Sequence, residues 1–239
     1  MCRRIYIDQP FDEMARNFAF AERGDVDDLG DRLPRYNGGA LEVYHIVIQD
    51  VERQRDLRRP VFAVARWGLT PAWMDRPRRQ PPVHARREEI NSNGLFQEAY
   101  RSRRCLIPLS GFFEWRDSLG TSRNEQPYAV AMKDQSIFAL AGIWEAWHHP
   151  IGIDIRSFAV VTCPPNEMMA TIQNRMPVII RREDYEHWLS PDPDPRDLMK
   201  PFNAEAMMMW PIARRVKTVR NPGAGVIDQI DPAPNGFCN

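Results

Sequence analysis

The chain has 239 residues, 43% hydrophobic and 27% charged, as in an ordinary soluble protein with one large or two small domains. Its 32 basic residues balance 32 acids, which argues against a strong nucleic-acid-binding field. No apolar run approaches the roughly 20 residues of a membrane span, and no basic-then-apolar leader opens the sequence. We therefore expect a cytoplasmic protein without membrane contact.

The first hundred residues predict few regular elements. The segment that starts at Asp8 opens like a capped helix, with Phe11, Met14 and Phe18 spaced for one face. Runs of β-branched and aromatic residues predict strands, and segments rich in Gly, Asp or Pro predict loops. In chain order we expect this helix, a loop at 24–39, paired strands at 41–48 and 61–67 joined by the turn 50–59, an irregular segment at 71–82 and a helix at 88–100.

The remaining residues predict a dense β region flanked by short helices. In chain order we expect strands at 105–109, 111–116, 128–133, 137–147 and 156–163, a helix at 166–171, a strand at 177–180, a helix at 183–189 and a strand at 210–219. No repeat or linker separates two cores. The layout predicts an α+β fold: a single domain (1–225) with a strongly bent, largely antiparallel β-sheet and peripheral helices, then a tail (226–239).

Four cysteines are present, and one of them has unusual chemistry. Cys105 and Cys163 lie in apolar runs and are expected to be buried, whereas Cys238 lies in the Pro/Gly-rich tail. No Cys forms a CxxC pair and no His lies at zinc-finger spacing from one, so a structural metal site is not expected. No cofactor is expected either. Removal of Met1 would leave Cys2 with an α-amine and a thiol, a pair that condenses with an aldehyde to an imine and then a thiazolidine. A Cys at position 2 is also commonly accidental.

A second candidate for chemistry is Glu114, in the sequence Gly-Phe-Phe-Glu-Trp-Arg. A carboxylate between aromatic residues on a strand is partly desolvated, which raises its pKa and suits it to proton transfer. The alternative is a Glu on the polar face of a strand, or one paired with an Arg.

Basic residues are unevenly distributed in this neutral chain. Arginines outnumber acids over residues 76–104, and a further basic stretch covers 214–220. Such a face favours modest, salt-sensitive contact with phosphates. The alternative is an ordinary solvated surface.

Five motifs recur in an order that resembles one known family. They are Met1-Cys2, Arg35-Tyr36-Asn37, Arg66-Trp67-Gly68-Leu69 with Pro71 and Trp73, Gly111-Phe-Phe-Glu114-Trp115, and Arg175-Met-Pro177-Val-Ile. The chain thereby resembles the SRAP (SOS-response-associated peptidase) family from Cys2 to about Asn221. Members crosslink covalently to abasic sites in single-stranded DNA through the N-terminal Cys.

The resemblance implies a separate chemical role for each site residue. The amine of Cys2 would attack the sugar aldehyde, Glu114 would shuttle protons, and the thiol would close a thiazolidine. The residues expected to line the site and its DNA groove are Arg4, Asn37, Trp67, Trp73, Arg86 and Arg175. For both tryptophans the alternative is core packing. The implied partner is single-stranded DNA with abasic sites, bound by a nucleoid-associated monomer.

Three positions depart from the family pattern. Arg3 stands where the family has Gly, and it would either crowd the pocket or contact a phosphate. Gln173 stands where the family has a His that is thought to help open the sugar, and Gln cannot transfer a proton at neutral pH. His84 stands where the family has Asn. Our hypothesis is that His84 takes over part of the acid role while Gln173 supplies a hydrogen bond; the alternative is an attenuated site.

Two rival functions remain open at this point. The first is a DNA-binding member of the family with attenuated chemistry. The second is a thiol peptidase, although the sequence shows no convincing Cys-His-Asn arrangement for one.

Overall fold

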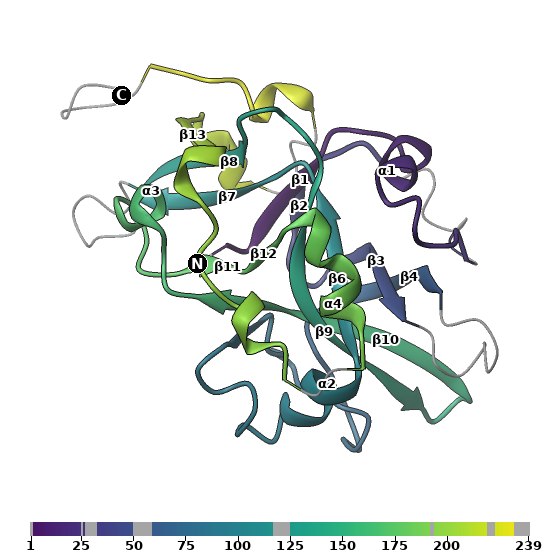
Figure 1. Cartoon of the computed structure of the whole chain (residues 1–239). Coiled ribbons are helices and arrows are strands. Elements are labelled where there is room, and N and C mark those ends of the chain that lie inside the picture. The colour runs from purple at the N-terminus through teal and green to yellow at the C-terminus, as the bar shows by residue number, and fades with distance from the viewer. Residues whose placement is uncertain are drawn as a thin grey trace.

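The computed structural model describes residues 2–24, 26, 33–49, 59–116, 125–191, 194–218 and 223–231 (Figure 1). Its strands are β1 (Arg4–Ile7), β2 (Arg35–Gly39), β3 (Val43–Gln49), β4 (Pro60–Trp67), β5 (His84–Arg86), β6 (Arg104–Leu109), β7 (Gly111–Arg116), β8 (Gln126–Met132), β9 (Phe138–His149), β10 (Ile153–Cys163), β11 (Met176–Pro177), β12 (Ile179–Ile180) and β13 (Met207–Pro211). The α-helices are α1 (Phe11–Asn17), α2 (Gln97–Ser102), α3 (Glu167–Ala170) and α4 (Tyr185–Leu189). Short 3-10 turns occur at Arg182–Asp184, Arg196–Leu198, Ala204–Ala206, Arg214–Lys217 and Ala224–Val226.

The larger sheet closes on itself. Its strands follow the order β11-β10-β4-β3-β6-β9-β12, and β9 also pairs with β10, which completes a ring through β10, β4, β3, β6 and β9. The pairs in this ring are antiparallel except β10 with β4. Strand β5 adds to β10 in parallel. Closure removes most free sheet edges and encloses the main apolar core.

The smaller sheet is antiparallel throughout, with the order β13-β8-β7-β1-β2. The chain passes from one sheet to the other at Ser110, between β6 and β7. The backbone N–H of Asp8 donates to the Ser110 hydroxyl across this corner, at 3.1 Å. A Cβ on Gly111 would lie 2.4 Å from the Tyr6 ring, so only glycine lets β7 approach β1 this closely.

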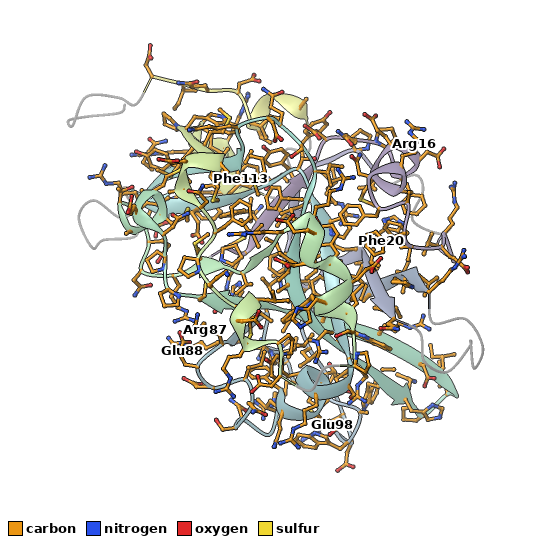
Figure 2. The ribbon with its side chains drawn as sticks, viewed as in Figure 1. Arg16, Phe20, Arg87, Glu88, Glu98 and Phe113 are labelled. Carbon is orange, nitrogen blue, oxygen red and sulfur yellow. The ribbon has the colours of Figure 1, made fainter. Side chains whose placement is uncertain are left out.

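Residues of β7 alternate between two apolar clusters because successive strand side chains point to opposite faces. Phe112 lies in the main core, whereas Phe113 packs against Tyr6 with ring centroids 5.4 Å apart, in a second cluster that includes Val226. Figure 2 labels Phe113 where the smaller sheet lies. Packing therefore continues past residue 225. Among the described residues, no helix is long and apolar enough to cross a membrane.

The α+β fold predicted from the sequence is confirmed, and so are the opening helix, the paired strands β3 and β4 and the irregular segment 71–82. The sheet is more than bent, because it closes into a barrel. The predicted turn 50–59 lies almost wholly outside the described residues, as does Cys238.

Four local predictions are wrong. The predicted loop 24–39 ends in β2, because a Gly-rich strand carries little β-propensity of its own. The helix predicted at 88–100 begins only at Gln97, after turns that include Asn93 and Gly94. The strand predicted at 177–180 is two short strands, β11 on β10 and β12 on β9. The strand predicted at 210–219 ends at Pro211.

Candidate active site at the N-terminus

Pairing of β1 with β7 brings Cys2 to Glu114. Arg4 lies opposite Phe113 in this antiparallel pair, so the residues before Arg4 run past Glu114. The backbone N–H of Cys2 donates to the Glu114 Oε1. That nitrogen is an amide while Met1 is attached, and it becomes the α-amine when Met1 is removed. The predicted nucleophile and the predicted proton shuttle are therefore in direct contact.

The environment of Glu114 suits it to proton transfer. The side chain is fully buried, and burial raises its pKa to about 7, an effect that the hydrogen bond from Cys2 partly opposes. A carboxyl whose pKa is raised towards neutrality can both accept and return a proton near pH 7. The partly desolvated carboxyl expected from the sequence fits this geometry better than a Glu on the polar face of a strand does.

The Cys2 thiol is held in its neutral form. The residue is buried, and burial together with the Glu114 charge raises the pKa of the thiol far above its usual range. The Sγ atom lies 3.4 Å from the carbonyl oxygen of Arg4, to which the S–H donates. A neutral thiol is a poor nucleophile, so the nitrogen is the stronger candidate for the first attack.

His84 also contacts Cys2, from the side of β5. Its Nε2–H donates to the carbonyl oxygen of Cys2 at 2.5 Å, and its ring meets that of Trp67 edge to face, with centroids 6.1 Å apart. Burial lowers the pKa of His84 to about 4, so the imidazole is neutral at pH 7. In this state His84 orients the Cys2 peptide as a hydrogen-bond donor, and the acid role expected for it does not follow from the geometry.

Gln173 is engaged elsewhere. Its Oε1 accepts the backbone N–H of Asn174 at 3.2 Å, and the backbone N–H of Gln173 donates to the Met169 carbonyl. Within the described part of the chain it makes no hydrogen bond to Cys2 or His84.

Arg4 and Asn37 bind the protein's own C-terminal segment. The Arg4 guanidinium donates to the Asn37 Oδ1 at 3.0 Å and to the Lys217 carbonyl at 2.9 Å. The Asn37 Nδ2 donates to the carbonyls of Val216 and Thr218. Both side chains thus tie β1 and β2 to residues 216–218. The sequence identifies 214–220 only as a basic stretch, and sequence reasoning misses these contacts because a backbone carbonyl leaves no signal in the sequence.

The two arginines expected in the DNA groove differ in availability. Arg175 is mostly buried; its guanidinium donates to Thr162 and forms an ion pair with Glu88 at 2.8 Å. Arg86 is exposed, on the same face of β5 as His84, and its contact with Glu89 is loose at 3.9 Å. Arg86 is therefore the better placed of the two for a phosphate.

The two candidate tryptophans also differ. Trp67 is 1% exposed, stacks on Phe158 and donates from Nε1 to the Val83 carbonyl, so core packing is the correct alternative for it. Trp73 is 64% exposed and can meet a base. Arg3 is exposed as well, and it makes no ion pair with another described residue. Among the described residues no group of His, Cys, Asp and Glu could hold a metal ion.

Comparisons with known proteins agree on one family. A sequence model described as SOS response associated peptidase (SRAP) matches residues 1–219. The chain is 29% identical over 236 residues to the abasic site processing protein YoqW of Bacillus subtilis (strain 168), covering 95% of this chain and 99% of that protein. It is 24% identical over 219 residues to the abasic site processing protein HMCES of Xenopus tropicalis, covering 80% and 63%. A crystal structure of a Bacteroides thetaiotaomicron protein matches with a TM-score of 0.82 at 25% identity, covering 96% and 100%.

Proposed function

Because this chain belongs to the SOS response associated peptidase (SRAP) family, we propose that it processes abasic sites in single-stranded DNA by attaching itself to them through Cys2. Relatives such as YoqW and HMCES are named as abasic site processing proteins. The observation that carries the covalent part of the proposal is the hydrogen bond from the Cys2 nitrogen to Glu114. It joins the attacking atom to a group whose pKa suits proton transfer.

The reaction is a condensation that releases one water. After Met1 is removed, the α-amine of Cys2 adds to the aldehyde carbon of the ring-opened sugar and forms a C–N bond. The resulting hydroxyl leaves as water, which gives an imine. The thiol sulfur then adds to the imine carbon while its proton moves to nitrogen, and the five-membered thiazolidine is complete.

The site residues fit these steps in order. Glu114 takes a proton from the Cys2 ammonium, which makes the amine nucleophilic, and returns a proton to the departing hydroxyl. The thiol stays protonated, and is therefore a poor nucleophile, until the imine has formed. His84 holds the Cys2 carbonyl and so fixes the direction of the amine. The protonation that opens the sugar ring, which Gln173 cannot supply, precedes these steps.

The groups available to the DNA are the exposed ones. Arg3 and Arg86 would bind phosphates on either side of the lesion, and Trp73 would stack on a neighbouring base. Arg4, Asn37 and Arg175 would act indirectly, because their polar groups already bind the protein.

A denaturing gel tests the proposal. The protein, with Met1 removal verified by mass, is incubated with single-stranded DNA that carries one abasic site. We expect a heat-stable shifted band that Cys2→Ser abolishes and that Cys163→Ser, a change at another buried cysteine, preserves. Salt-sensitive binding without a band would contradict covalent capture, and hydrolysis of unrelated peptides would favour a peptidase.

A further inference from the structure

The loop between β4 and β5 begins and ends beside the Cys2 site. The Leu69 N–H donates to the Pro82 carbonyl at 2.9 Å, and the Trp67 Nε1–H donates to the Val83 carbonyl at 2.8 Å. His84, which contacts Cys2, follows at once. Both ends of the loop are therefore fixed next to the proposed nucleophile.

The outer part of the loop, residues 73–79, surrounds an open hollow of about 800 Å³ and is called the arginine loop below. Four prolines fix φ within or beside it, at positions 71, 77, 81 and 82. The indole N–H of Trp147 on β9 donates to the Met74 carbonyl at 2.5 Å. The prolines and this hydrogen bond restrict the loop, which lowers the entropy cost of ordering it around a ligand.

The arginines of the arginine loop have no charged partner in the part of the chain that the structure describes. Arg76, Arg78 and Arg79 are exposed, and none forms an ion pair or hydrogen bond with any other described residue. Asp75 is the one acid among them. By contrast, Arg103 and Arg175 each have a carboxylate partner within 3.0 Å. Three unpaired guanidinium groups beside the exposed Trp73 ring match a ligand that carries several phosphates and a planar base.

We propose that the arginine loop is a second contact surface for single-stranded nucleic acid, binding the strand that flanks the lesion. This inference rests on the proposed function for the position of the strand. Arg79 precedes His84 by five residues, so their Cα atoms lie at most about 18 Å apart. At the roughly 3.4 Å per phosphate of a strand in duplex DNA, about 18 Å spans five phosphates, and a more extended single strand places fewer phosphates there. The loop therefore reaches phosphates within about five nucleotides of a sugar held at Cys2.

Salt dependence of binding tests this surface independently of the chemistry. The probe is a fluorescent single-stranded oligonucleotide without an abasic site, and anisotropy gives the affinity across a range of NaCl concentrations. The test variant carries Arg76→Ala, Arg78→Ala and Arg79→Ala. The control carries Arg16→Ala, Arg59→Ala and Arg181→Ala, which remove the same charge from exposed positions elsewhere. Figure 2 shows Arg16 on the opposite side of the view from Arg87 and Glu88, which follow the loop.

We expect the slope of log K against log salt to fall by about 2 in the test variant, since each single-strand phosphate contributes roughly 0.7. The control should retain most of the slope, and both variants should melt at the wild-type temperature. Equal slopes in the two variants would overturn the inference. A wild type that never crosslinks to abasic DNA, while the two slopes still differ, would refute the proposed function and leave the arginine loop as a nucleic-acid contact.

Discussion

The Glu114 carboxylate on β7 accepts a hydrogen bond from the backbone nitrogen of Cys2, 112 positions away in the chain. The register of β1 on β7 fixes this contact, with Arg4 opposite Phe113 and Ile5 opposite Phe112. A sheet register is set by every pair along the strands, so one side chain can be changed without moving the two strands apart. Substitutions at this pair should therefore report on chemistry.

Crosslinking by the wild type should be fastest near pH 7 and slower on both sides. Burial raises the pKa of Glu114 to about 7. Below that pH the carboxylate that accepts the amine proton is lost. At higher pH the Cys2 ammonium deprotonates and no longer supplies the proton that Glu114 passes to the departing hydroxyl. Glu114→Gln should lower the rate by about 10²–10⁴-fold and flatten the profile. Rates at a series of pH values on gels check this, with anisotropy to show that DNA affinity is unchanged. Equal loss of rate and affinity would contradict a proton-transfer role.

His84→Asn should retain most of the crosslinking rate, whereas His84→Ala should lose about tenfold or more. The neutral imidazole donates a hydrogen bond to the Cys2 carbonyl, and an Asn amide can donate as well, but Ala cannot. Single-turnover rates of the two variants check the difference. If His84→Asn is as slow as His84→Ala, with a changed pH profile, His84 transfers a proton and the positioning role is wrong.

Trp67→Ala should lower the stability of the protein, whereas Trp73→Ala should weaken its binding to DNA. Trp67 is packed in the core, so its loss should lower the free energy of unfolding by about 3–5 kcal/mol. Trp73 is exposed, so its loss should leave the melting temperature unchanged and weaken binding to single-stranded DNA by roughly 5- to 150-fold. Calorimetry measures the unfolding of both variants, and fluorescence anisotropy measures their affinity for single-stranded DNA. Destabilisation by Trp73→Ala, or an unchanged affinity, would count against stacking.

Asn37→Ala should destabilise the protein by about 1–3 kcal/mol, because it leaves the carbonyls of Val216 and Thr218 without their Asn37 donor. For a chain of this size each kcal/mol lowers the melting temperature by roughly 2–4 °C. Asn17→Ala, at a half-buried position on α1 whose side chain donates to the Glu13 carbonyl, is the control. A melting temperature unchanged by Asn37→Ala would show that the C-terminal segment is held by other contacts.

The sequence predicts the parts of the site better than their assembly. The aromatic residues around Glu114 correctly indicate a buried strand. No local sequence pattern predicts β1, which has only four residues. The sequence of β2, Arg-Tyr-Asn-Gly-Gly, is typical of a turn. The contact of Cys2 with Glu114 depends on the pairing of β1 with β7, which no local pattern predicts. Long-range strand register is decided by packing, which a single sequence does not display.

Side-chain availability is likewise invisible in the sequence. Trp67 and Trp73 stand six positions apart in one motif, yet one is in the core and the other in solvent. Arg86 and Arg175 both looked like phosphate ligands, and only the structure shows that Glu88 neutralises Arg175. The sequence suggests that His84 takes over part of the acid role missing at Gln173. It does not show that His84 is buried at the Cys2 carbonyl, where burial makes it a neutral hydrogen-bond donor.

Intact-mass measurement of the DNA–protein adduct tests the central claim most directly. The wild type, with Met1 removed, should give the sum of protein and abasic oligonucleotide less one water, without any reducing agent, and its Cys2 thiol should no longer react with an alkylating reagent. Cys2→Ala keeps the amine and lacks the sulfur, so it should form an adduct that survives denaturation only after borohydride reduction. A wild-type adduct that needs borohydride, or whose Cys2 thiol is still alkylated, would contradict the thiazolidine.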